Sequence, residues 1–249
     1  MSGPSTRTAL ALLLGALIAI PAYTQFREDG QFIRAQASDA VMQTTRTGKF
    51  GYILKGSVWK DQYKKPLHSL SVCWENPSGD QDADSRQLVR TAVEETWQRY
   101  SNMTFLGWNS CQAGVATNIR IRVADEQAHT VGLGNELYNV SNGMVLNFTF
   151  IKWNTGCTAD STTRVLCIRA TAVHEFGHAI GISHEQNRDD KSATCDKPAE
   201  GENGDTKLTP YDPDSVMNYC NPRYLNFGKL SYFDVITVQS TYGPPLKTS

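Results

Sequence analysis

Several features are scarce in this chain, and each scarcity excludes a class of protein. The 24 Lys and Arg residues nearly balance the 25 Asp and Glu residues, so the formal net charge is −1 at pH 7. Because no basic stripe accompanies this balance, nucleic acid is not an expected partner. The longest apolar run, residues 9–20, has about 12 residues, whereas a helix needs about 20 to span a bilayer. We therefore expect no membrane association once the N-terminal leader is removed.

The N-terminal apolar run is typical of a secretory leader. Arg7 precedes the run and Pro21-Ala22 follows it, which supplies a positive start and a small residue for cleavage. We predict a signal peptide over residues 1–24 and a secreted, extracellular protein. An uncleaved membrane anchor is the alternative.

The next segment, residues 25–55, lacks a strong hydrophobic period. It contains Arg46 and Lys49, basic sites where a protease could cut. We interpret it as a pro-segment, with an ordinary N-terminal arm as the alternative. Residues 56–245 then have the length of one globular domain.

The cysteines favour disulfides. The chain has six of them and contains no C-x-x-C, so a second metal site built from cysteines is disfavoured. Behind an export signal, cysteines are typically oxidised in pairs. Many pairings are possible, and local spacing favours Cys157–Cys167 and Cys195–Cys220, which leaves Cys73–Cys111.

Histidine is also scarce, yet three of the five histidines fall in one short block. The block reads H-E-x-x-H-x-x-G-x-x-H-E from His174 to Glu185. On a helix, His174 and His178 lie on one face, about 6 Å apart along the axis, and can bind one ion. Gly181 can adopt the positive φ that ends a helix, so the chain can turn and bring in His184. The alternative is a core helix whose histidines bond backbone carbonyls.

The block therefore predicts one catalytic zinc ion held by His174, His178 and His184. Three protein ligands leave one position open, which is typical of a catalytic rather than a structural zinc site. Glu175 lies between the first two histidines in angle and would reach metal-bound water rather than the metal. Because zinc lowers the pKa of bound water towards about 7, Glu175 could act as the general base of a hydrolysis.

This block resembles the motif of the metzincin clan of zinc endopeptidases, and most closely that of the astacins. Glu185 directly after the third histidine is the astacin choice, where matrixins typically carry Ser. Downstream, residues 215–219 resemble the Met-turn, with Met217 as an apolar floor under the histidines. Tyr219 stands where astacins place a tyrosine that can ligate the metal. The chain departs from astacins at Asn218, where a histidine is common, and it has no clear F-x-G-D motif.

The resemblance implies an α+β, metzincin-type zinc protease fold. Such a fold has a twisted mixed sheet with an antiparallel edge strand, an active-site helix and a C-terminal helix. The N-terminal subdomain would extend to about residue 184 and the C-terminal subdomain over about residues 185–245.

The resemblance also implies an astacin-like zinc metalloendopeptidase that cleaves protein or peptide substrates and acts as a monomer. Tyr219 would be a metal ligand and a catalytic residue, since it would swing away and hydrogen-bond the oxyanion. Glu185 would either receive the N-terminus freed by pro-segment removal or pair with a nearby Arg. The alternatives are a matrixin-type enzyme and a catalytically silent, secreted zinc-binding module.

Hydrophobic periodicity predicts the surrounding elements. We predict helices over Asp82–Tyr100 and Arg164–Ile180, and a last helix from a Ser231/Asp234 capping box to Gly243. We predict strands over Leu67–Trp74, Asn118–Val123 and Gly143–Phe150. By the resemblance, the last of these strands would be the sheet edge that runs antiparallel to a bound peptide. An edge covered by a loop is the alternative.

Overall fold

The computed structural model describes residues 51–77 and 79–246. The predicted signal peptide and nearly all of the predicted pro-segment lie outside the described residues. The elements along the chain are β1 (Tyr52–Ile53), η2 (Lys55–Ser57), β2 (Ser69–Trp74), α2 (Ala83–Val93), η3 (Glu94–Gln98), β3 (Thr104–Ser110), β4 (Ile119–Val123), β5 (His129–Thr130), η4 (Gly134–Leu137), β6 (Met144–Leu146), η5 (Thr155–Thr158), α3 (Ser161–Ala179), η6 (Glu185–Asn187), β7 (Thr206–Lys207), η7 (Tyr224–Gly228) and α4 (Tyr232–Tyr242). Within this part of the chain, no helix combines the length and the apolar character needed to cross a bilayer.

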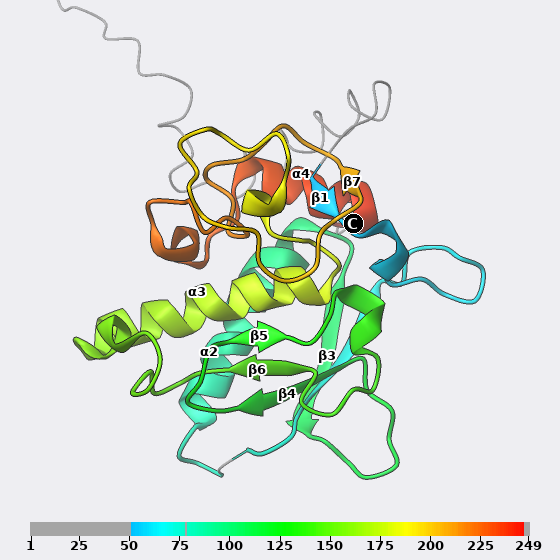
Figure 1. The fold of residues 1–249 in the computed structure, drawn as a ribbon. Coiled ribbons are helices and arrows are strands. Elements are labelled where there is room, and N and C mark those ends of the chain that lie inside the picture. Colours follow the sequence, from blue (N-terminus) through cyan, green and yellow to red (C-terminus); the bar gives the residue numbers. More distant parts are fainter. Residues whose placement is uncertain (1–50, 78, 247–249) are drawn as a thin grey trace, which may run out of the picture.

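A five-stranded mixed sheet forms the N-terminal half of the fold, in the order β3-β2-β4-β6-β5. The first four strands pair in parallel, whereas β5 pairs antiparallel with β6 and ends the sheet. Figure 1 shows α3 lying between this sheet and the C-terminal segments that include α4. The predicted α+β class, with its antiparallel edge strand, active-site helix and C-terminal helix, is therefore confirmed.

The prediction that Gly143–Phe150 forms the edge of the sheet is wrong. The strand β6 covers only Met144–Leu146 and lies between β4 and β5. Its three residues are all buried, which suits an inner strand covered on both faces. The chain leaves the β region by Phe150, which has a φ of 54°. The edge strand is β5, which is too short at two residues to show an alternating pattern.

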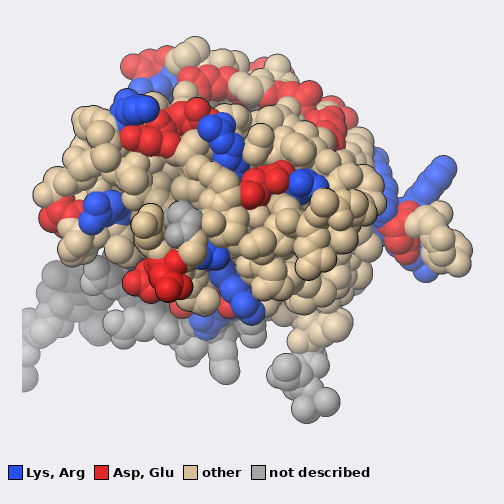
Figure 2. All heavy atoms as spheres, turned by 90° about the horizontal axis from the view of Figure 1, so that it is seen from below, with Lys and Arg blue, Asp and Glu red and all other residues tan. Residues whose placement is uncertain are grey.

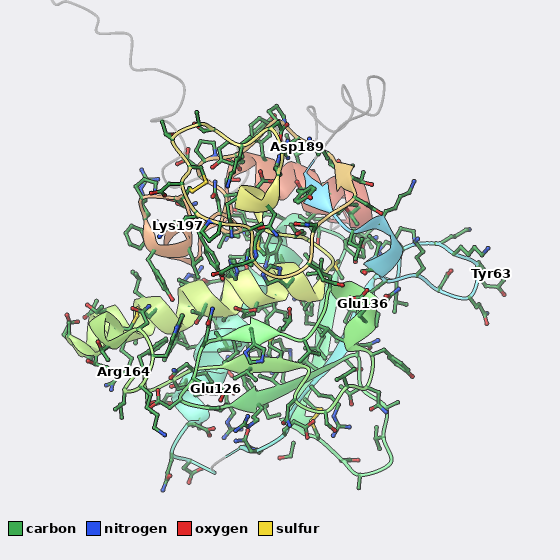
Figure 3. All side chains as sticks on the ribbon, in the orientation of Figure 1. Tyr63, Glu126, Glu136, Arg164, Asp189 and Lys197 are labelled. Atoms are coloured by element: carbon green, nitrogen blue, oxygen red, sulfur yellow. A yellow bond between two sulfur atoms is a disulfide. The ribbon has the colours of Figure 1, made fainter. Side chains whose placement is uncertain are left out.

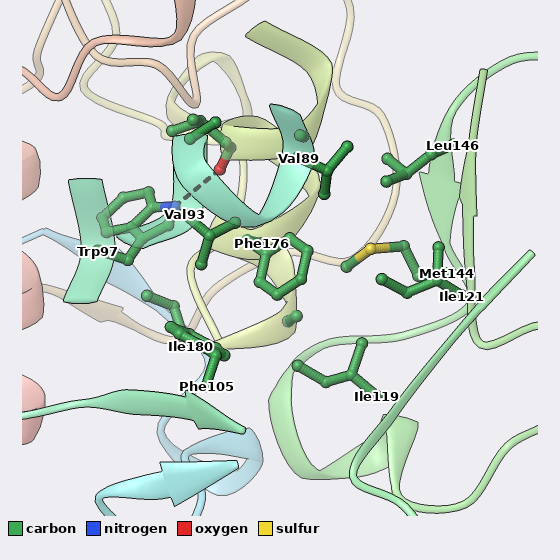
Figure 4. Close-up of a cluster of buried hydrophobic side chains, with 14 of the residues drawn as sticks. Val89, Val93, Trp97, Phe105, Ile119, Ile121, Met144, Leu146, Phe176 and Ile180 are labelled. Carbon is green, nitrogen blue, oxygen red and sulfur yellow. Dashed lines mark hydrogen bonds between the residues drawn. The ribbon is translucent and has the colours of Figure 1, made fainter. Parts of the chain in front are cut away.

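The core lies where α2 and α3 pack on the sheet (Figure 4). The predicted helix over residues 82–100 is confirmed as α2 with its continuation η3, and its apolar face is buried. Trp97 of that continuation donates its indole N–H to the carbonyl of Val173 in α3 at 2.8 Å. Phe176 packs edge-on against Phe105 of β3, with ring centroids 5.3 Å apart. These contacts fix α3 to η3 and to the sheet.

The helix α3 begins three residues before its predicted start and ends at Ala179, one residue before its predicted end. Asp160 is its N-cap, since its carboxylate accepts the Thr163 N–H at 2.8 Å. At the other end Gly181 has a φ of +89°, and the Ile182 N–H donates to the Gly177 carbonyl at 3.0 Å. The positive φ expected at Gly181 turns the chain out of the helix towards His184.

The C-terminal segments are mostly irregular and are held by the Cys195–Cys220 disulfide, by the capping box of α4 and by the pairing of β1 with β7. All three predicted disulfides are confirmed: Cys73–Cys111, Cys157–Cys167 and Cys195–Cys220. The predicted capping box starts α4, because the Ser231 hydroxyl accepts the Asp234 N–H and the Asp234 carboxylate accepts the Ser231 N–H. In addition, β1 pairs antiparallel with β7, so the first described residues pack among segments from far along the chain.

Charged side chains of both signs are spread over the face of the domain seen in Figure 2. Several charged side chains of the domain pair with each other, as in the bidentate contact of Arg120 with Glu75 at 2.7 and 3.0 Å. This face therefore presents no extended field of one sign to a charged partner.

Candidate metal centre

The three predicted histidine ligands meet at one point. The Nε2 atoms of His174, His178 and His184 lie 3.0–3.1 Å from one another, and all three side chains are buried. Nitrogen atoms bound to one tetrahedral zinc ion at 2.0–2.1 Å are separated by about 3.3 Å. The spacing of the triad therefore fits a single zinc ion.

The hydrogen bonds of the other ring nitrogens show which atoms are free to bind. The Nδ1 atoms lie 2.8–2.9 Å from the backbone carbonyls of Val216, Ile182 and Glu200. A carbonyl can only accept, so each Nδ1 carries the proton and each Nε2 presents a bare lone pair. Three lone pairs facing one another repel, and a shared cation removes that repulsion. Carbonyl partners on the second nitrogen are typical of histidines that bind a metal.

Burial keeps the three rings neutral, which metal binding requires. Burial, and next the neighbouring His184, lowers the pKa of His174 to about 3. Burial is also the main reason that the pKa of His178 lies well below its ordinary value and that the pKa of His184 is lowered. Protons therefore do not compete with a metal for these nitrogens at neutral pH.

Glu175 lies beside the triad with a carboxylate oxygen that has no partner. The side chain is 3% exposed, and its Oε2 makes no hydrogen bond. Burial raises the pKa of this carboxyl to about 8. A buried polar atom without a partner needs an explanation, and water or substrate bound next to the metal would provide one.

Tyr219 packs directly against the triad. Its ring centroid lies 5.2 Å from that of His174 and 4.6 Å from that of His184. Burial, and next the charge of Glu175, raises the pKa of the Tyr219 phenol above its ordinary value. The Gln186 side chain accepts the Tyr219 N–H at 3.1 Å and so fixes the backbone there. The structure thus brings together every residue proposed from the sequence for the metal and the reaction.

Met217 lies beneath the histidines, as the resemblance implied. It is fully buried, and a Cβ added to Gly177 would come within 2.3 Å of its Sδ. The turn that carries it is held by Asp234, whose carboxylate accepts the Ser215 hydroxyl at 2.6 Å and the Val216 N–H at 2.9 Å. These bonds also place the Val216 carbonyl that orients His174.

Glu185 is buried beside an arginine. Its Oε1 lies 3.5 Å from an Arg188 nitrogen, and its Oε2 accepts the Asp212 N–H at 3.2 Å. Burial raises the pKa of Glu185 to about 8, although Arg188 opposes the shift. Of the two roles expected for Glu185, the pairing with an arginine is present in the structure.

Two cavities open on either side of the triad and share Gln127, Ala128, Glu175, Glu200 and Tyr219. The first, about 270 Å³, runs along β5 as far as Leu133 and reaches His178, His184 and Glu202. The second, about 320 Å³, extends past His174 to Trp153 and Tyr224. Together they form one cleft between the sheet edge and the C-terminal segments.

Sequence reasoning missed the groups that orient the site. These are the three carbonyl acceptors, together with Gln186 and Asp234. The carbonyls leave no sequence signal because every residue has one. Gln186 directly follows Glu185 and received no role from the sequence, and Asp234 was assigned only to the capping box.

No protein-family model matches the chain. The chain is 24% identical over 189 residues to the zinc metalloproteinase nas-25 of Caenorhabditis elegans, and the match covers 69% of this chain and 42% of that protein. The chain therefore spans less than half the length of this curated relative. The solved structure of myroilysin matches with a TM-score of 0.54 at 19% identity, over 79% of this chain and 100% of that chain, which shows a shared fold.

The three histidines have the spacing of a zinc site, and the fold that carries them is shared with myroilysin. In sequence, the chain is similar to a zinc metalloproteinase, which agrees with such a site.

Proposed function

We propose that this chain is a secreted zinc-dependent endopeptidase of the astacin type, with Glu175 as its general base. One observation carries the proposal: three bare Nε2 atoms converge beside the unpartnered Oε2 of Glu175, inside an open cleft. A structural metal site would have no need of an open cleft or of an adjacent free carboxylate.

Bound by His174, His178 and His184, one zinc ion would supply a Lewis acid that lowers the pKa of water towards about 7. Glu175 takes the proton of the attacking water and passes it to the leaving amine. The charge of a zinc ion in the site would oppose the burial that raises the pKa of this carboxyl to about 8, and so would favour the carboxylate that accepts the proton. Tyr219 is proposed as a further metal ligand. Once its hydroxyl is off the metal, it would donate a hydrogen bond to the oxyanion.

The substrate is proposed to lie along β5. As the edge of the sheet, β5 has one side without a strand partner among the described residues, and the cavity by the triad follows it. An extended peptide can add to such an edge through its main chain. If the peptide runs antiparallel to β5, the residues before the cut would form main-chain hydrogen bonds with the end of β5 near Leu133. The residues after the cut lie near Gln127, beside the second cavity.

Export is part of the proposal. All six cysteines form disulfides, which is typical of an oxidising compartment. Because Tyr52 and Ile53 are buried in β1, we place the end of the pro-segment before Tyr52. Determination of the N-terminus of the secreted protein by mass spectrometry tests this boundary, and a start after Ile53 would contradict it.

Two other candidates remain from the sequence. A matrixin-type enzyme is disfavoured by Glu185 and Tyr219. A silent zinc-binding module is disfavoured because the general base and all three ligands are intact and meet in the structure.

The decisive experiment measures casein and peptide hydrolysis by the wild-type protein, with and without 1,10-phenanthroline. We expect hydrolysis that the chelator abolishes. Glu175→Gln should retain zinc and lose turnover by about 100-fold or more, whereas Glu126→Gln, at an exposed ion pair with Arg122, should not. Zinc-loaded wild-type protein without any hydrolysis would favour the silent module, and near-normal activity of Glu175→Gln would remove Glu175 as the base.

A further inference from the structure

The second cavity contains a tyrosine with no assigned role. Tyr224 begins η7, which packs on α3. The next three residues, Leu225, Asn226 and Phe227, have φ values of 43°, 47° and 54°. Three consecutive non-glycine residues in the left-handed region are strained, and such backbone persists only where packing enforces it. Strain of this kind is concentrated at functional sites.

The packing that enforces this turn is visible on both sides of it. Leu225 is buried in the core. A Cβ added to Gly228 would lie 2.9 Å from the Arg169 side chain and 3.0 Å from the Arg169 carbonyl, so the turn touches α3 directly. Tyr224 is thereby held in one position beside the helix that carries the metal ligands.

The Tyr224 hydroxyl is buried without a hydrogen bond. Burial raises the pKa of this phenol to about 12; the Asn154 side chain, which lies nearby without a well-aligned hydrogen bond, lowers it, and the charge of Glu175 raises it. The hydroxyl therefore keeps its proton at any physiological pH and can donate a hydrogen bond. The charge of Glu175, the proposed general base, acts on it.

Other polar side chains of this cavity are already satisfied. Thr171 donates to the Cys167 carbonyl at 2.9 Å, and Asn218 donates to the Asp212 carbonyl at 2.8 Å. Asn221 accepts the Arg223 N–H at 2.9 Å. Among the described residues that line the cavity, only Glu175 Oε2 and Tyr224 Oη are buried side-chain atoms without a partner. Glu175 is assigned to the reaction, so the Tyr224 hydroxyl remains as the unused donor.

The cavity has room and walls for a side chain. Its volume is about 320 Å³, and Trp153 and Leu225 supply apolar lining. Of its charged residues, Glu175 and Glu200 are acidic, and Lys197 alone is basic. Figure 3 shows Lys197 on the C-terminal loops above α3. A carboxylate would have to bury its charge in this cavity, whereas a neutral amide oxygen can approach the hydroxyl at a smaller desolvation cost.

We propose that Tyr224 determines specificity: the second cavity receives the side chain that follows the cut, and the Tyr224 hydroxyl selects the amide oxygen of Gln or Asn there. This inference rests on the proposed function and on the proposed direction of the substrate along β5. An apolar side chain of the same size would fill the cavity and leave the buried hydroxyl unpaired. Leaving the hydroxyl without its hydrogen bond should lower kcat/KM by about 10-fold.

The test compares three peptides that differ only in the residue after the cut, which is Gln, Met or Glu. Gln and Met are nearly equal in size, so their ratio isolates the hydrogen bond. Wild-type protein should cleave the Gln peptide about 10-fold more efficiently than the Met peptide, and more efficiently than the Glu peptide. Tyr224→Phe should bring the Gln-to-Met ratio of kcat/KM close to 1, because neither peptide can then gain or lose the hydrogen bond of the hydroxyl. The matched control is Tyr138→Phe, at a tyrosine that is 57% exposed.

The outcomes separate this inference from the proposed function. If the wild-type protein cleaves no peptide, the proposed function itself fails. If it cleaves all three but does not favour Gln over Met, or favours Glu, the specificity assigned to Tyr224 is wrong whatever the variant does. An unchanged Gln-to-Met ratio in a folded, zinc-loaded Tyr224→Phe protein would also overturn it.

Discussion

Replacing Gly177 with alanine tests whether close packing beneath the histidines supports the metal site. Gly177 lies inside α3, between His174 and His178. A Cβ at this position would lie 2.3 Å from Met217 Sδ, 3.0 Å from Met217 Cε and 3.2 Å from Trp97 Cζ2. Both neighbours are fully buried. The added methyl group therefore has no free volume to enter, and Met217 must move.

Two opposing effects set the change in unfolding free energy that Gly177→Ala should cause. In a helix interior, alanine is more favourable than glycine by about 1 kcal/mol. Overpacking a filled core typically costs about 1–3 kcal/mol. The net expectation is a loss of about 1 kcal/mol of unfolding free energy, or about 2–4 °C in Tm for a domain of this size.

The displacement should also reach the metal site. The Met217 carbonyl accepts the Glu185 N–H at 3.0 Å, and the preceding Val216 carbonyl orients His174. Disturbing such a partner typically weakens metal binding by about 10-fold or more. We therefore expect Gly177→Ala to lose zinc affinity as well as stability.

The assays are urea unfolding of the metal-free protein and zinc affinity by competition with a chelating dye. Gly56→Ala is the matched control, because a Cβ there meets nothing within 4 Å. The double variant Gly177→Ala/Met217→Ala should be less destabilised than the sum of the two single variants, since removing the Met217 side chain makes room. A Gly177→Ala protein that is about 1 kcal/mol more stable than wild type, with unchanged zinc affinity, would refute the reasoning.

Two further predictions concern the disulfides and the protonation of the histidines. The Cys195–Cys220 bridge closes a separation of 25 residues, so replacing both cysteines with Ser should lower the unfolding free energy by about 3.5 kcal/mol through loop entropy. Unfolding of the zinc-loaded protein measures this loss. A change below 1 kcal/mol would show that other contacts hold the segment. Because burial lowers the pKa of His174 and its two partners, zinc affinity should stay nearly constant between pH 7.5 and 6. Imidazoles of ordinary pKa would lose about 50-fold over that range. A Glu175→Gln/Tyr219→Phe protein keeps other titrations out of this measurement, and a loss approaching 50-fold would contradict it.

The features that the sequence predicted correctly are short-range. His174, His178 and His184 fall within one helix and the turn after it, so helical geometry and the positive φ of Gly181 bring their nitrogens together. The buried face of α2 and the Ser231 capping box are equally local, because each depends on residues three or four positions apart. The resemblance added Met217 and Tyr219, whose position under and beside the triad no spacing could show.

The features that required the tertiary structure join residues far apart in the chain. The edge strand β5 has only two residues, and its place was decided by the burial of β6 on both faces. The carbonyls of Val216 and Glu200 orient histidines 42 and 16 residues away. The unpartnered hydroxyl of Tyr224 is defined only by what surrounds it. By itself, the sequence predicted that the three histidines meet at one metal site, because the geometry of one helix is a local property. Packing decided the cleft, the sheet edge and the groups that orient the ligands, because only packing brings distant segments into contact.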